Sequence, residues 1–339
     1  MRIIPKFKID KLPYKDNFIR NVFKMNQLVL GPHVKFFENG LSKCFNYKYA
    51  NTTSSGYAAI FLTLKSLELK KARIVVPLVS TCQSITNAVL ANGFEVVFCK
   101  IDSKHLSLSE DHLEEIFQKK PFDVIIAPSH FGIPAPIKSY RKYGVPIIED
   151  ACQAFLTRTK IKSSADFVIL SFYPTKHFNC IEGGAILHNY PEKDKIIKDL
   201  TYYNQQHIYD GKSRFNLRLP NLHAAFGCIL LKNLDSDYNI FIKIRDNYIR
   251  GIINSNILLP SQIEPGVIPW RFLINSKNSL LVENFKLSNI QIDKEMINLN
   301  KRIITRTHKQ WFDDYHSIPF YKSISQKDQN FVINKINKI

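Results

Sequence analysis

The chain has 339 residues, of which 45% are hydrophobic and 22% charged, and its formal net charge is +18. This length suffices for a large core shared between two lobes, and the composition is that of a globular protein. No apolar run reaches the roughly 18–20 residues of a membrane span, and the basic N-terminus lacks the apolar core of a secretory signal. We therefore expect neither a membrane protein nor a secretory signal.

The positive charge and the cysteines restrict the function further. The lysines are scattered, without a basic run or a basic-aromatic alternation, so nucleic acid is not an expected partner. A positive field would instead attract a small polyanion such as a nucleotide diphosphate. The six cysteines stand far apart without a CxxC pair, which argues against a metal site. Reduced thiols in a cytoplasmic protein are expected.

The N-terminal part contains a candidate phosphate site. Residues 1–30 show no clear period, and a short helix after Gly31, a strand over Tyr47–Thr52 and a longer helix from about Tyr57 follow. Ser54-Ser55-Gly56 stands at the start of the longer helix. Free amides and the positive end of the helix dipole can bind phosphate there, but a serine cap explains the same residues.

Strand and helix signals then alternate along the chain. The predicted strands are Arg73–Pro77, Glu95–Ile101, Asp123–Pro128 and Val145–Ile148, and the predicted helices are Thr81–Ala91, one that starts at Ser109, and Ile137–Tyr143. This repeated order predicts an α/β fold with a mostly parallel sheet that is covered on both faces.

The stretch from Val145 to Asn189 contains the residues with the clearest chemistry. Asp150 follows one apolar strand, and Lys176 follows a second strand over Phe167–Phe172. Because ligands bind at the carboxyl ends of parallel strands, both side chains could face one pocket. A lysine that binds an aldehyde as a Schiff base and an acid that keeps a pyridine nitrogen protonated form a pyridoxal phosphate site. Taken singly, each is more often a solvated loop residue.

A change of pattern near Asp237 predicts a second lobe. It contains an amphipathic helix through Arg250, a β-type run over Val267–Ile274, and a tail that reads as a strand and a helix. Before it, a helix is predicted over Glu192–Asn204. We therefore divide the chain into a large cofactor-binding domain, residues 1–235, and a small C-terminal α+β domain, residues 236–339. We expect the N-terminal segment to pack on the small domain.

Several motifs, in order, resemble one known family. EDACQA after an apolar strand, SFYPTK about twenty residues later and EGGAILHN resemble the DegT/DnrJ/EryC1/StrS family of sugar aminotransferases. The Ser55-Gly56 turn, the His130-Phe131-Gly132 loop and the Asn216-Leu217-Arg218 element extend this resemblance, which is strong from about Gly31 to Leu231. It implies the type I aminotransferase fold, pyridoxal 5'-phosphate as cofactor, and a homodimer with shared active sites.

The resemblance also implies roles for individual residues. Lys176 would form the internal Schiff base and later move a proton, and Asp150 would pair with the pyridinium nitrogen. The other implied cofactor contacts are Ser55, Gly56 and Tyr57 at the phosphate, Thr81 at the stacking position, Gln153 at the ring hydroxyl or phosphate, Ser171 at the phosphate, and Asn216 reaching the neighbouring subunit's phosphate.

Two of these positions depart from the family pattern. Tyr57 stands where the family has threonine, and Thr81 stands where it commonly has an aromatic ring that stacks on the cofactor. Either a one-residue shift brings another side chain to the cofactor ring, or a smaller group contacts it. His130 has two readings as well, as a cofactor or substrate contact and as a packing residue.

The implied reaction is transamination of a nucleotide-linked keto sugar, with glutamate as amino donor. Lys176 favours this reaction, because related sugar dehydratases have histidine at that position. The amino sugar would enter surface polysaccharide, such as lipopolysaccharide O-antigen, or another glycoconjugate. Two alternatives are a pyridoxal or pyridoxamine phosphate lyase of the same fold, and a cofactor-free relative, which Tyr57, Thr81 and the compact second lobe motivate.

Overall fold

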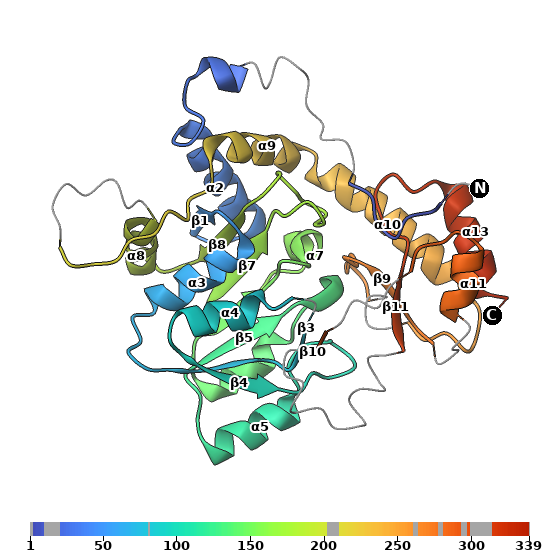
Figure 1. Ribbon diagram of the computed structural model, residues 1–339, viewed down its shortest axis with the longest axis horizontal. Helices are drawn as coiled ribbons and strands as arrows, with labels where there is room; N and C mark the ends of the chain where they lie inside the picture. Colours follow the sequence, from blue (N-terminus) through green and yellow to red (C-terminus); the bar gives the residue numbers. More distant parts are fainter. Residues whose placement is uncertain are drawn as a thin grey trace.

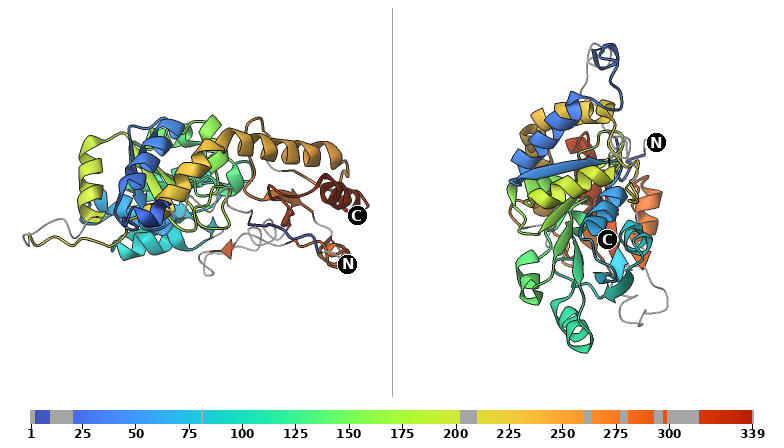
Figure 2. Two further views of the ribbon diagram at one scale, coloured as in Figure 1. Left: turned by 90° about the horizontal axis from the view of Figure 1, so that it is seen from above. Right: turned by 90° about the vertical axis from the view of Figure 1, so that its left-hand side faces the viewer.

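The computed structural model describes residues 3–9, 21–80, 82–201, 210–259, 264–276, 281–292, 297–298 and 314–338. They form a large body around a sheet and a smaller second body, and the long helix α10 (Leu234–Gly251) connects the two (Figure 1). The molecule is elongated in the direction of this connection, as the view from above shows (Figure 2). Both ends of the chain lie on the side of the second body.

The large body is built on a seven-stranded sheet in the order β1-β8-β7-β6-β5-β2-β4. Its strands are β1 (Tyr49–Thr53), β2 (Arg73–Pro77), β4 (Glu95–Cys99), β5 (Val124–Pro128), β6 (Ile147–Asp150), β7 (Phe167–Ser171) and β8 (Gly184–His188). The neighbours from β4 to β7 are parallel, and β8 is antiparallel to both β7 and β1. The predicted α/β class is thereby confirmed, whereas β8 is not among the predicted strands.

Helices cover both faces of this sheet. The described helices of the large body are α2 (Pro32–Phe45), α3 (Gly56–Ser66), α4 (Ser84–Ala91), α5 (Glu110–Lys119), α6 (Ile137–Tyr140), α7 (Phe155–Lys160), α8 (Pro191–Thr201) and α9 (Asn221–Lys232). One apolar cluster joins α3, α4 and α8 to one face of the sheet. A second cluster joins α2, α5, α6, α7 and α9 to the other face.

Burial on both faces explains why the strands read as continuous apolar runs. In β5, Val124 and Ile126 belong to the cluster beneath α3 and α4, whereas Ile125 and Ala127 belong to the cluster on the opposite face. A strand with two covered faces needs apolar residues at every position. The continuous apolar runs therefore made the parallel strands predictable from the sequence.

The second body contains a short antiparallel pair, β9 (Phe272–Asn275) with β11 (Tyr315–Ile318). Around it lie α10 and the helices α11 (Leu281–Leu287) and α13 (Gln326–Ile336). The N-terminal segment packs there too, since Ile4 bridges to Ile290 and the Phe320 N–H donates to the Lys6 carbonyl oxygen at 3.1 Å. A domain boundary at residue 235 stays a prediction.

The two bodies are also connected by backbone pairing. Strand β10 (Ile297–Asn298) pairs antiparallel with β3 (Val79–Ser80), which directly follows β2. Within the described ranges, no helix combines the length and the apolar character that a bilayer crossing needs.

The predicted strand Val267–Ile274 is wrong in its first half. The Ile268 N–H donates to the Thr157 hydroxyl at 2.9 Å, and the Trp270 N–H donates to the Phe131 carbonyl oxygen at 2.9 Å. These residues therefore bind the large body instead of extending β9. The apolar residues before β9 are buried, but in the contact between the two bodies and not in a strand.

Candidate active site

The carboxyl ends of β5, β6 and β7 meet at one edge of the sheet, where a cavity of about 280 Å³ opens. Asp150 at the end of β6, Ser171 at the end of β7 and Lys176 in the following loop all line it. The start of α3 contributes Ser55 and Gly56 to the same cavity. The two groups predicted to bind opposite ends of one cofactor ring thus share one cavity.

Asp150 is held by its own turn and by a buried ion pair next to it. Its carboxylate accepts a hydrogen bond from the Cys152 N–H at 3.0 Å, and its carbonyl oxygen accepts one from the Ser129 N–H at 2.9 Å. The adjacent Glu149 is fully buried and pairs with Arg158 at 2.6 Å. The end of β6 is therefore fixed on both sides of the sheet.

Lys176 lies between the two bodies. Its Nζ lies 4.6 Å from the centroid of the Trp270 ring, and the Trp270 indole N–H donates to the Thr175 carbonyl oxygen at 2.9 Å. Burial lowers the pKa of Lys176, while Cys152 and Asp150 act in the opposite direction. A lowered pKa increases the fraction of neutral amine, the form that a proton-transferring lysine needs.

The N-terminus of α3 provides a pocket for an anionic group. The Ser55 hydroxyl caps the helix by accepting a hydrogen bond from the Ala58 N–H at 3.1 Å. A Cβ at Gly56 would lie 3.1 Å from both Ser171 Cβ and Cys152 Sγ, so glycine keeps this corner open. Backbone N–H groups and the helix dipole at such a corner favour phosphate. Ser55 can therefore cap the helix while the same helix start binds a phosphate.

Gln153 and His130 also line the cavity. The Gln153 side-chain oxygen accepts a hydrogen bond from the Phe131 N–H at 2.7 Å, which fixes the 3₁₀ turn η1 (His130–Gly132). The His130 ring lies 2.7 Å from the Leu106 carbonyl oxygen, and burial lowers its pKa. A neutral His130 can donate its Nδ1–H to that oxygen. His130 is therefore both bonded to the backbone at Leu106 and part of the cavity lining.

Three further predicted residues have different positions. Tyr57 lines the cavity and stacks on Phe61, with ring centroids 6.3 Å apart. Thr81 lies outside the described residues. Asn216 is exposed and does not line this cavity. A role for Asn216 at a neighbouring subunit stays a prediction.

The cavity also contains residues to which the sequence analysis gives no role. Cys82, Cys152, Tyr173 and Glu182 line it. Cys152, Tyr173 and Glu182 stand within the three quoted motifs, so position in a motif is the signal that could have found them. Trp270 comes from the second body and has no local signal, because its contact with Lys176 arises only when the two bodies pack.

Comparison with known proteins identifies the family. The model of the DegT/DnrJ/EryC1/StrS aminotransferase family matches residues 14–337. The chain belongs to this family.

Curated members of the family resemble the chain over part of their length. The 3-oxo-glucose-6-phosphate:glutamate aminotransferase of Bacillus subtilis is 29% identical over 262 residues, which cover 73% of this chain and 59% of that protein. The UDP-4-amino-4,6-dideoxy-N-acetyl-beta-L-altrosamine transaminase of Campylobacter jejuni is 30% identical over 219 residues, covering 60% of this chain and 58% of that protein. The matches thus span about three fifths of these relatives.

Solved structures share the fold over nearly the whole chain. DesV of S. venezuelae, in complex with a ketimine intermediate, has a TM-score of 0.89 at 22% identity and covers 100% of this chain and 98% of its own. NtdA of Bacillus subtilis, with bound cofactor PMP, has a TM-score of 0.85 at 23% identity and covers 94% and 80%. This likeness confirms the predicted type I aminotransferase fold.

Proposed function

We propose that this family member is a pyridoxal phosphate-dependent aminotransferase that converts a keto sugar to an amino sugar. The observation that carries the proposal is the shared cavity of Asp150 and Lys176 at the carboxyl edge of the sheet, next to the N-terminus of α3. Solved structures of the same fold contain pyridoxal or pyridoxamine phosphate. The family membership agrees with this activity.

The residues of the cavity fit this cofactor. The corner that a Cβ at Gly56 would fill suits the phosphate, with Ser55 and Ser171 beside it. Asp150 would bind the pyridine nitrogen, and Lys176 would bind the aldehyde carbon covalently. The volume of about 280 Å³ is near the lower end of small-molecule sites. When bound, the cofactor would supply an electron sink for a carbanion.

Each residue would then have one task in the reaction. Asp150, as a carboxylate, would keep the proton on the pyridine nitrogen. Lys176, once released as a free amine, would take a proton at Nζ and return it to a neighbouring carbon, which its lowered pKa favours. The Trp270 ring, 4.6 Å from Lys176 Nζ, would exclude water from that transfer.

The proposed substrates follow from the relatives and from charge. A keto sugar carrying a phosphate or a nucleotide diphosphate is a polyanion, and the net charge of +18 would attract it. Glutamate as donor is supported by the name of one relative. Use of the product in surface polysaccharide, and a cytoplasmic location, are parts of the same proposal.

The proposal includes a homodimer whose active sites are shared. Large apolar side chains are exposed on α2, in the segment before it, and at or next to residues that line the cavity, as a subunit interface would require: Phe23, Leu30, Phe36, Tyr173 and Ile181. Asn216 is exposed on the same chain and would reach the partner's phosphate. Such a contact would make each site depend on two subunits.

The test combines spectroscopy with two variants. Purified protein with pyridoxal phosphate should develop a visible absorption band that borohydride abolishes, with the reduced cofactor found on Lys176 by mass spectrometry. Lys176→Ala should lose both signals, and Lys160→Ala, which removes an exposed lysine paired with Asp235, should keep them. Release of 2-oxoglutarate from glutamate, dependent on a keto-sugar nucleotide, then distinguishes the transferase from a lyase. A protein that never takes up the cofactor supports the cofactor-free alternative instead.

A further inference from the structure

Two thiols line the cavity that contains Asp150 and Lys176. Cys152 follows β6, and Cys82 lies in the loop between β3 and α4. All six cysteines of the chain are free thiols, so neither of these two is engaged in a disulfide. The two sulfur atoms come from different elements that border the same space.

Cys152 lies beside Asp150 in the cavity that also contains Lys176. Its N–H donates to the Asp150 carboxylate at 3.0 Å, and burial and Asp150 raise the pKa of its thiol whereas Lys176 lowers it. The Sγ atom is also 3.1 Å from the position of a Cβ at Gly56. A ring held in this cavity by Asp150 and Lys176 would therefore lie close to this sulfur.

Cys82 lines the same cavity from a different loop. Pairing of β3 with β10 holds the start of its loop, and its Sγ accepts a hydrogen bond from the Ser84 N–H at 3.4 Å. Burial is the main cause of the pKa shifts of Cys152 and Lys176, and Cys82 contributes to both shifts, so its sulfur lies near these two groups. Cys82 is exposed, so a reagent can reach it while the cavity is empty.

We infer that Cys152 and Cys82 contact the two opposite faces of the cofactor's pyridine ring, so that sulfur replaces an aromatic stacking partner in this chain. The inference rests on the proposed function. It also names the groups that would contact the ring, given that Thr81 stands where the family commonly has an aromatic side chain. A polarizable sulfur packs favourably against an aromatic ring. Burial raises the pKa of the Cys152 thiol, so a neutral sulfur lies beside Asp150 and adds no competing negative charge.

The first test is protection from alkylation. The thiol adds across the carbon–carbon double bond of N-ethylmaleimide. Sulfur bonds to one carbon and the thiol proton goes to the other, so there is no leaving group. The rate at each cysteine is measured by mass spectrometry in the apoprotein and in the protein loaded with pyridoxal phosphate. Alkylation of Cys82 should slow at least about tenfold on loading, because a ring then covers its sulfur, whereas Cys44 and Cys228, outside the cavity, should not change.

Inorganic phosphate separates ring contact from filling of the phosphate corner. Phosphate alone should leave the alkylation rate of Cys82 unchanged. If phosphate slowed the alkylation of Cys82 as much as pyridoxal phosphate does, the inference would be overturned. Binding of the phosphate group at the start of α3 would then explain the protection without a contact between Cys82 and the ring. Unchanged Cys82 alkylation in protein whose Lys176 carries the cofactor would also overturn it, yet would leave the proposed function intact.

The second test measures retention of the cofactor. Cys82→Ala and Cys152→Ala should each raise the dissociation constant about 2- to 10-fold, the range of one sulfur-aromatic contact. Both variants should still yield the reduced cofactor adduct on Lys176, and Cys44→Ala is the matched control. Unchanged affinity in both cavity variants would contradict the inference. Absence of any adduct in the unsubstituted protein would contradict the proposed function and the inference together.

Discussion

At the scale of single residues, the position of Asp150 depends on local structure. An acid at the last residue of a buried parallel strand must lie at the carboxyl edge of the sheet, and Lys176 follows the neighbouring strand. Their meeting in one cavity was therefore predictable from the sequence. The contact of Lys176 with Trp270 was not, because it requires the second body to pack on the first.

The negative charge of Asp150, rather than its shape, is what the proposed reaction needs. Asp150→Asn should keep the fold and the cofactor adduct on Lys176, because asparagine retains an oxygen that can accept the Cys152 N–H. It should slow the half-reaction with glutamate at least about 100-fold, because the pyridine nitrogen loses its proton. Rapid-mixing absorbance spectroscopy of the loaded protein measures this rate.

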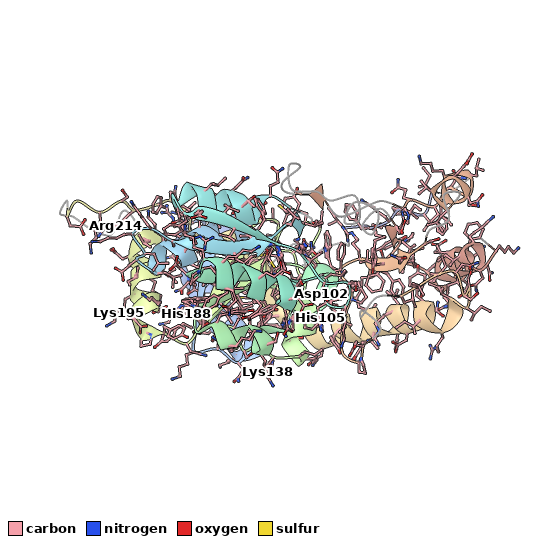
Figure 3. All side chains as sticks on the ribbon, turned by 90° about the horizontal axis from the view of Figure 1, so that it is seen from below. Asp102, His105, Lys138, His188, Lys195 and Arg214 are labelled. Carbon is pink, nitrogen blue, oxygen red and sulfur yellow. The ribbon has the colours of Figure 1, made fainter. Side chains whose placement is uncertain are left out.

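Asp102 offers a matched control for this substitution. It too lies beyond the carboxyl end of a strand of the sheet, close to His105 (Figure 3). However, it binds the Lys104 and His105 N–H groups at 2.8 and 2.7 Å and does not line the cavity. Asp102→Asn should change the rate less than about twofold, since it touches none of the proposed reacting groups. An unchanged rate in Asp150→Asn would remove that residue from the mechanism.

At the scale of elements, the apolar period predicted the parallel strands but not every partner. In β8 only Ala185–Leu187 form an apolar run, directly after two glycines, and the strand is antiparallel, which no local pattern reports. β9 begins five residues later than predicted, at Phe272, because the preceding residues bind the large body. Sequence periodicity identifies what is buried, but not which surface buries it.

The edge formed by α2, β1 and β8 contains two titratable groups with opposite shifts. Burial raises the pKa of Glu38 to about 7, and its carboxyl oxygen accepts hydrogen bonds from the Thr52 N–H and hydroxyl at 2.8 and 2.9 Å. Burial lowers the pKa of His188 to about 4. His188 lies inside the large body near α8, whereas Lys195 of that helix is exposed (Figure 3).

These shifts affect stability in opposite directions. The folded-state pKa of Glu38 exceeds its unfolded value, so its contribution is complete below about pH 4.5 and is lost as the pH rises through about 7. The folded-state pKa of His188 lies below its unfolded value, so its contribution is complete above about pH 6.5 and is lost as the pH falls towards 4. Between about pH 4.5 and 6.5 the two groups change the stability with opposite slopes, so their pH dependences partly cancel.

Glu38→Gln should remove only the first effect. Glutamine keeps the oxygen that Thr52 binds and carries no charge, so the variant should gain about 2 kcal/mol of unfolding free energy at pH 8, after allowance for the partial exposure of the residue. At pH 4.5 the difference should vanish. Urea unfolding at both pH values measures it, with the exposed Glu115→Gln as control. A gain of equal size at both pH values would refute the titration argument.

At the scale of the whole molecule, the site depends on contacts that join distant parts. Trp270 reaches Lys176 from the second body, and β10 pairs with β3 ahead of the loop that carries Cys82. Neither contact leaves a mark in the local sequence, since each depends on how two separately patterned bodies meet. The family resemblance predicts one more contact between distant parts, made by an asparagine that lies outside the cavity of its own chain.

That asparagine provides a test of the shared active site. If Asn216 binds the phosphate in the partner's cavity, Asn216→Ala should raise the dissociation constant of pyridoxal phosphate about 10- to 100-fold, the range of a lost hydrogen bond to a charged group. Asn87→Ala, at an exposed position of α4, should not change it. Equilibrium titration, followed by the visible absorption band, measures both.

Mixing two defective chains then decides which subunit supplies the group. A dimer of one Asn216→Ala chain and one Lys176→Ala chain has, in a shared arrangement, one site with Lys176 from the first chain and Asn216 from the second. Joint refolding of the two variants should therefore restore tight cofactor capture at low pyridoxal phosphate concentration, although neither variant alone shows it. If Asn216 instead served the cavity of its own chain, no mixed dimer would contain an intact site, and the mixture would stay as weak as its components.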